Sequence, residues 1–126
     1  MASPVGATLM LPDEVTSLAS GAAVVGAFTD IDISAYTGSQ VAKAALLRVE
    51  MFVFDGVMQL RENGTNPTNP RTYRHYGNIT GPKAIKTSSL FIIPVDENET
   101  FEYKVPTMSL GDNGTGWEIF LEGWYV

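Results

Sequence analysis

The chain has one histidine, His75, and a mechanism that moves protons near neutral pH would use it first. It lies between Arg74 and Tyr76. A serine triad or a histidine-ligated metal site would need partners for this residue. The sequence contains no Gly-x-Ser-x-Gly nucleophile motif, no second histidine and no cysteine, so both a hydrolase triad and a zinc site lack members. We therefore expect His75 to have a structural role.

Two aspartates, Asp30 and Asp32, are spaced so that they project from the same face of an extended strand. A pair of carboxylates can do general acid–base work, as in a glycosidase. The alternative is the solvent-facing side of an edge strand whose other side carries Ile31 and Ile33. Because no third group is placed to join the two acids, we expect the edge strand and no catalytic residues.

Two polar loops contain the hard oxygen ligands that calcium prefers, residues 96–99 (Asp-Glu-Asn-Glu) and 111–114 (Gly-Asp-Asn-Gly). Neither has the spacing of a helix-flanked calcium loop that ends in a bidentate glutamate. The chain also lacks the glycine-rich motifs that bind phosphates. We expect both loops to be tight turns, and we predict no metal and no cofactor. The residue types alone leave open whether either loop holds a cation.

Aromatic side chains are the remaining candidates for a binding site. Strand alternation places Trp117 and Tyr125 on one face and Trp124 on the other. At least one of these faces must be core, so most rings are expected to pack internally. A glycan-stacking platform at Trp117 or Trp124 remains the alternative. The aromatic residues considered are Tyr73, Tyr76, Tyr103, Trp117, Trp124 and Tyr125.

The elements that must position these groups are organised around residues 46–61 (LLRVEMFVFDGVMQLR). Apolar and other residues alternate with a period of two in the first half, which is typical of a strand. Asp55-Gly56 favours a two-residue hairpin turn, so the sequence predicts a central antiparallel hairpin. One competing interpretation is a helix that begins near Ala42, because Ala, Leu, Arg, Glu and Met favour helices. The β-branched and aromatic residues that follow favour the strand.

Short strands separated by turns account for the rest of the chain. In the run 88–95 the apolar residues 90–93 are continuous, as expected when both faces are covered, and Pro94 marks an end or an edge. In 100–105, Phe101, Tyr103 and Val105 should point inward and Glu102 outward. Exposed turns or loops are expected at 62–70 and 77–83. The further predicted strands are 14–20, 21–33, 72–76 and 117–126.

These elements predict an all-β fold, an antiparallel β-sandwich of about seven or eight short strands. Residues 1–13 are expected to form an N-terminal arm, and residues 14–126 a single domain, which suits a chain of 126 residues. A net charge of −6 argues against general nucleic-acid binding. No basic segment precedes a long apolar one, so we expect neither a signal peptide nor a membrane span.

Charge is distributed unevenly along the chain. Residues 61–86 carry five basic side chains against Glu62, whereas residues 87–126 carry seven acids against Lys104. Such asymmetry can steer the chain onto a neighbour of opposite charge or onto a second copy of itself. The alternative is a pair of solvated loops whose charges differ in sign, which would give the same distribution of charge along the sequence. The partner-contact residues that we predict from the basic stretch and the apolar arm are Leu9, Leu11, Arg71, Arg74, Lys83 and Lys86.

Three segments together resemble small all-β virion proteins of tailed bacteriophages. They are Asp30–Gly38 (DIDISAYTG), Ala44–Val49 (AALLRV) and Phe120–Val126 (FLEGWYV). In that group a D-x-D-x-S-A-Y/W-x-G turn leads into a long strand, and a late strand closes with glycine and aromatic residues. The chain departs from this pattern at Thr37, where a larger apolar residue is expected, and in its long Asn/Pro loop at 62–70.

The resemblance implies a jelly-roll-like sandwich and a non-enzymatic capsid decoration (cement) protein. Its expected partner is the major capsid protein, its expected oligomer is a trimer, and its expected location is the outer surface of the virion after synthesis in the host cytoplasm. It implies neither a nucleic-acid nor a membrane partner. The alternative within the same group is a tail-fibre or carbohydrate-binding module that recognises a host surface glycan.

Overall fold

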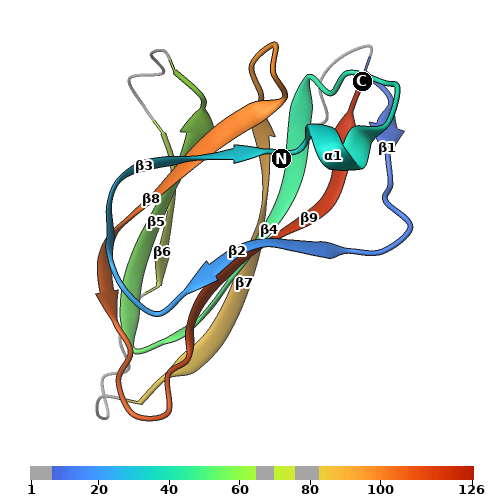
Figure 1. Cartoon of the computed structure of the whole chain (residues 1–126). Coiled ribbons are helices and arrows are strands. Elements are labelled where there is room, and N and C mark those ends of the chain that lie inside the picture. Colours follow the sequence, from blue (N-terminus) through green and yellow to red (C-terminus); the bar gives the residue numbers. More distant parts are fainter. Residues whose placement is uncertain (1–6, 65–69, 76–82) are drawn as a thin grey trace.

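The computed structural model describes residues 7–64, 70–75 and 83–126, and within them it forms two antiparallel sheets packed face to face (Figure 1). The predicted all-β sandwich is confirmed. The strands of the described residues are β1 (Leu9–Met10), β2 (Thr16–Gly21), β3 (Val25–Asp32), β4 (Ala44–Val53), β5 (Asp55–Glu62), β6 (Arg71–His75), β7 (Ile85–Pro94), β8 (Thr100–Ser109) and β9 (Gly116–Tyr125), with one helical turn, α1 (Ser34–Thr37).

The five-stranded sheet has the order β1-β9-β4-β7, and β2 pairs with β9 further along the edge that β1 occupies. The four-stranded sheet has the order β3-β8-β5-β6. β1 lies within the part of the predicted arm that the structure describes, where Leu9 pairs with Tyr125. The centre of the predicted 62–70 loop and most of the predicted 77–83 turn lie outside the described residues.

The predicted hairpin at Asp55-Gly56 is wrong, because β4 and β5 belong to different sheets. The chain crosses between the sheets at Phe54, whose backbone N–H donates to the carbonyls of Ser109 and Leu110 at 3.0 and 2.9 Å. Gly56 lacks the positive φ of a hairpin turn. A Cβ there would lie 3.0 Å from Met108 Cε, so glycine is needed for close packing and not for turning.

β4 shows why the strand interpretation holds over the helix. Its alternate residues from Ala45 to Val53 are fully buried, and those between them are half-buried. This is the period of two expected of a strand with one face in the core. Because β4 and β5 each bury one face, the apolar arms of 46–61 meet across the sandwich and not within one sheet. Leu47 and Met51 from one sheet and Met58, Leu60 and Phe101 from the other are among its fully buried side chains.

β9 contains an irregularity that changes which side chains enter the core. Leu46 pairs with Gly123 and Leu47 with Leu121, so Glu122 is an extra residue in the ladder. A bulge of this kind shifts the alternation by one residue. As a result Trp124 joins Trp117 in the core, and the prediction that these two rings lie on opposite faces is wrong.

The sandwich edge formed by β6 and β7 is closed by side chains. Tyr73 Oη donates to Thr87 Oγ1, and His75 Nδ1 lies 2.9 Å from the same oxygen. The rings of Tyr73 and Phe91 are 6.0 Å apart. β7 ends at Pro94 at this edge, as expected, but Leu90 is 52% exposed, so the prediction of full coverage on both faces is wrong.

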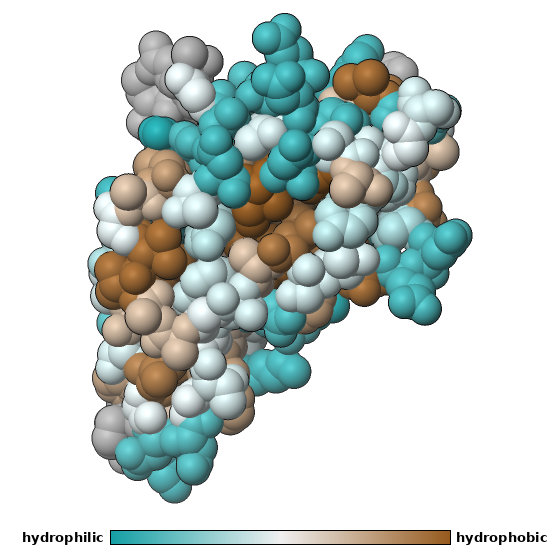
Figure 2. Space-filling model, viewed as in Figure 1, coloured by the Kyte–Doolittle hydropathy of each residue, from teal (hydrophilic) through white to brown (hydrophobic). Residues whose placement is uncertain are grey.

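The other edge, between β2 and β3, is more open. Figure 2 shows hydrophobic residues at the bottom of a hollow, in the region that Figure 1 shows between these two strands. β2 and β3 pair with different sheets, β2 with β9 and β3 with β8. The connection between them therefore bridges the layers without a ladder of backbone hydrogen bonds across the gap.

Candidate functional site

The groups that the sequence singled out for chemistry lie far apart. His75 is on β6 and the two aspartates are on β3, at opposite edges of the four-stranded sheet. With strands about 4.8 Å apart, three intervals separate them by roughly 14 Å. Asp30 and Asp32 are exposed and Ile31 and Ile33 are buried, which confirms the predicted edge strand.

The Asp30–Gly38 segment is a structural turn. Asp32 Oδ1 accepts a hydrogen bond from the Ser34 backbone N–H at 2.8 Å, which starts α1. Gly38 follows with φ +66°, a conformation that glycine adopts at little cost. The segment thus ends β3 and turns the chain over the end of the sandwich.

Glu99 holds this turn in place. Its carboxylate oxygen Oε1 accepts from Thr37 Oγ1 at 2.6 Å and from the Ala42 backbone N–H at 2.7 Å, and its carbonyl accepts from Ile33 N–H at 3.0 Å. The residue is 9% exposed and has φ +57°. Thr37, which departs from the phage pattern, is therefore polar because it donates to this buried carboxylate.

Asp96 organises the turn between β7 and β8. Burial opposes its ionisation, but hydrogen bonds from Asn63 Nδ2 and from the backbone N–H groups of Thr100 and Asn98 outweigh that effect and lower its pKa below the ordinary value. The carboxylate of Asp96 thus builds the turn between β7 and β8, while that of Glu99 ties this turn to α1 and the loop after it. The prediction of a tight turn at 96–99 is confirmed.

Trp117 and Trp124 belong to the core, so the expected internal packing is confirmed for these two rings and the alternative of a glycan-stacking platform there is wrong. Trp117 and Trp124 are 4% and 5% exposed. Trp117 Nε1 donates to the Ala23 carbonyl at 3.2 Å, and its ring packs 5.2 Å from that of Tyr103, whose pKa burial raises. Tyr76 lies outside the described residues. Tyr36 on α1 is 40% exposed and was not among the predicted rings.

One end of the sandwich exposes aliphatic side chains, and we call it the α1 end. It consists of β1, residues 11–15, α1 and residues 38–43, which Figure 1 shows gathered near the C-terminus. Figure 2 shows hydrophobic residues at the surface there, at the upper right. Of the eight large hydrophobic residues exposed within the described chain, five belong to this end. They are Leu9, Leu11, Val15, Tyr36 and Val41.

A hollow of about 540 Å³ lies within the α1 end, between Leu11 and Tyr36. Asp13 and Glu14 also border it, and Trp124 contributes to its lining. Trp124 Nε1 is buried and has no hydrogen-bond partner among the described residues. The α1 end therefore combines an apolar rim with acidic side chains.

The predicted partner-contact residues do not form one patch. Leu9 and Leu11 both lie over Gly123, where a Cβ would be 3.1 and 3.3 Å from their methyl groups. Arg71 begins β6 and is exposed, whereas Arg74 lies at the opposite end of that strand, 3.1 Å from Asp55. The remaining two basic residues lie in or next to β7, which belongs to the other sheet. Lys83 precedes β7 and is exposed, and Lys86 lies on β7.

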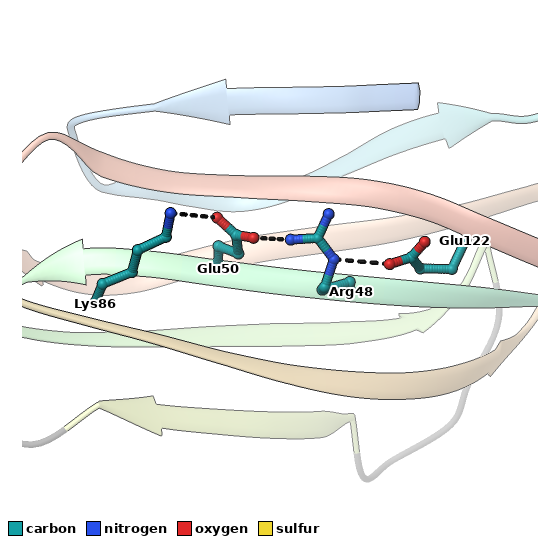
Figure 3. Close-up of polar contacts among 4 residues, drawn as sticks. All are labelled: Arg48, Glu50, Lys86 and Glu122. Carbon is teal, nitrogen blue, oxygen red and sulfur yellow. Dashed lines mark hydrogen bonds and ion pairs between the residues drawn. The ribbon is translucent and has the colours of Figure 1, made fainter. Parts of the chain in front are cut away.

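The outer face of the five-stranded sheet carries a row of alternating charges (Figure 3). Lys86 Nζ lies 3.5 Å from Glu50, Glu50 pairs with Arg48, and Arg48 Nε donates to Glu122 at 2.7 Å. The Arg48 guanidinium lies 4.2 Å from the centre of the Phe120 ring. Sequence reasoning missed this row because its members come from three strands that only the pairing brings together.

A groove of about 460 Å³ lies at one end of this row. Glu50 and Lys86 border it together with Phe52 and Glu118, and the turn after β2 forms another wall. The groove is separate from the α1 end, since its lining residues and those of the hollow between Leu11 and Tyr36 do not overlap.

A scan against protein-family models gave no match, and a search of curated protein sequences gave none either. Among the described residues, no helix has the length and apolar composition needed to cross a membrane. Two surfaces of the described residues are candidates for binding, the α1 end and the outer face of the five-stranded sheet.

Proposed function

We propose that this chain is a non-enzymatic virion structural protein that decorates and stabilises the outer surface of a bacteriophage capsid. The observation that carries the proposal is the α1 end, which gathers five of the eight exposed large hydrophobic residues of the described chain. A contiguous exposed apolar patch is typical of a surface that binds another protein. Its partner is the major capsid protein, and the decorating unit is a trimer.

The architecture suits a clamp. Leu9 lies on β1 and Leu11 follows it directly, and β1 is paired with the last strand of the sheet through Leu9 and Met10. The loop after α1 is tied to the sandwich by Glu99 through Ala42. A surface held by strands and buried hydrogen bonds loses little conformational entropy on binding. A protein that binds the assembled shell and not its free subunits stabilises the shell by mass action.

The buried polar side chains also support a structural role. His75 is buried and contacts Thr87 Oγ1. The buried carboxylates of Glu99 and Glu102 accept from Thr37 and Arg61. Each of these groups thus contributes to holding two elements together.

The location test is a protein profile of purified particles. We expect the chain in heads separated from tails, in a fixed ratio to the major capsid protein, and cryo-electron microscopy should place the α1 end against the shell. A chain found in tails, or absent from heads, would refute the proposal. Sedimentation of the free protein tests the trimer.

The contact test compares two exposed leucines. Leu11→Ser at the α1 end should weaken binding to particles that lack the chain by about tenfold or more, because burying a leucine contributes about 1.5–3 kcal/mol. Leu90→Ser is the matched control, since Leu90 is exposed on β7 and away from that end. Equal binding by the two variants would show that the α1 end is not the contact.

A further inference from the structure

The groove on the outer face of the five-stranded sheet has an aromatic floor. Phe52 on β4 pairs with Lys86 on one side and with Gly116 on the other. Gly116 has φ +114°, and a Cβ there would lie 1.9 Å from the Gly21 carbonyl oxygen. Only glycine fits at this position, so no side chain covers the flank of Phe52, which stays half-exposed.

Polar side chains surround this ring on the same face. Two residues further along, Glu50 on β4 pairs with Glu118 on β9, and Glu118 pairs with Ser20 on β2. Cross-strand partners of this kind place their Cβ atoms about 4.5–5.5 Å apart. Lys86 Nζ lies 3.5 Å from Glu50 Oε1, and Thr115 borders the groove next to Gly116. Hydrogen-bond acceptors and donors thus stand within a few ångströms of one apolar ring.

We propose that this groove binds a saccharide through one or two neutral sugar rings. The C–H face of a sugar ring packs on the exposed face of Phe52, and its hydroxyls donate to Glu50 and Glu118. Other hydroxyls accept from Lys86. The volume of about 460 Å³ lies within the range of about 300–1,000 Å³ that is usual for small-ligand sites.

The charges select against other ligands of similar size. Within the described residues Glu50 is paired with Arg48 and Lys86, whereas no ion pair is found for Glu118, so Glu118 gives the groove a negative charge that repels a phosphate or another anion. An aliphatic or purely aromatic ligand would remove water from Glu118 without replacing its hydrogen bonds. A polyol with an apolar face satisfies the ring and the acids together.

The test begins with the full chain on an array of neutral and acidic oligosaccharides, followed by titration of the best ligand with amide chemical-shift mapping. Shifts are expected in residues 20–22, 50–52 and 115–118. Phe52→Ala and Glu118→Gln should each weaken binding by about tenfold. Neutral glycans should bind more tightly than their sulfated or sialylated forms.

Two matched variants separate the groove from the rest of the face. Phe120→Ala removes a ring of the same size that stacks on Arg48, and Glu122→Gln changes the acid that pairs with Arg48. Both should bind within about twofold of the parent, because neither residue lines the groove.

The proposal is overturned if no glycan binds at millimolar concentration, if acidic glycans bind best, or if Phe120→Ala reduces binding as much as Phe52→Ala does. It does not rest on the capsid contact. A chain that binds glycans but not particles, or particles but not glycans, therefore tells which of the two proposals fails.

Discussion

The α1 end and the outer face of the five-stranded sheet differ in which side chains they bury. The α1 end buries a carboxylate and exposes aliphatic side chains, whereas the sheet buries aliphatic side chains and exposes charged ones. At the α1 end the carboxylate of Glu99 is inside and hydrogen-bonded, while Leu11 and Val41 are 70% and 62% exposed. On the sheet face, Val49 and Met51 are inside, and Arg48 and Glu50 pair with each other on the surface. The outer face of the sheet pairs its charges within the single chain, whereas the α1 end leaves large aliphatic side chains exposed.

This difference predicts which charged side chain contributes most to the free energy of unfolding. Glu99→Ala should destabilise the fold by about 2–4 kcal/mol, because it leaves the Ala42 N–H without its acceptor and the buried Thr37 hydroxyl with only the Ser34 carbonyl at 3.3 Å. The exposed Glu97 in the same turn is the control, and Glu97→Ala should stay within about 0.5 kcal/mol. Urea unfolding followed by tryptophan fluorescence measures both. Similar losses for the two variants would contradict the role assigned to Glu99.

Removing a charged side chain from the outer face of the five-stranded sheet should lower the free energy of unfolding by less. Arg48→Met should cost about 1 kcal/mol, since the lost ion pairs are partly exposed and the guanidinium contact with the Phe120 ring adds little at the surface. The loss should shrink in 1 M salt, where the parent's exposed pairs are screened. Glu99→Ala should show no such dependence on salt. Unfolding at two salt concentrations checks this, and a salt-independent loss for Arg48→Met would mean that packing dominates.

A change in exposed aliphatic area should leave the folded state nearly unchanged. Leu11→Ser is expected to alter the free energy of unfolding by less than about 0.5 kcal/mol, because the side chain is 70% exposed. The same variant is the one expected to lose particle binding. Thermal denaturation checks its stability. A loss above about 1 kcal/mol would mean that Leu11 stabilises the chain itself and would weaken its use as a binding probe.

Local signals predicted the strands but not their pairing. Alternation in 46–53 correctly marked β4, and the Asp55-Gly56 signal for a hairpin failed because each arm buries one face across the sandwich. In β9, Gly123 interrupts the alternation, and a glycine inside a strand is a sign of a bulge. That signal was available in the sequence and would have placed Trp124 in the core.

The two surfaces were harder to predict, for a physical reason. Leu9 and Leu11 were found from their exposure in an arm, which is a local property. Glu50 and Glu118 are 68 residues apart, and Glu99 and Thr37 are 62 apart. Only the fold makes such residues neighbours, and neither pair has a local sequence pattern that marks it.

The smallest expected effect is the dependence of stability on pH that Asp96 contributes. The pKa of Asp96 is lowered in the folded state, so its ionised form contributes stability that is present above the unfolded value of about 3.8 and is lost as pH falls through the folded pKa. Asp96→Asn removes this contribution. Its free energy of unfolding should therefore depend less steeply on pH than that of the parent between about pH 5 and pH 2.

Denaturant titrations at half-unit pH steps measure this dependence, with Asp112→Asn as the control, since Asp112 is exposed in another loop. The parent and Asp112→Asn should weaken together as the solution is acidified, and Asp96→Asn should converge with them at the lowest pH. Parallel curves for all three proteins would show that hydrogen bonds to Asp96 do not favour its ionised form.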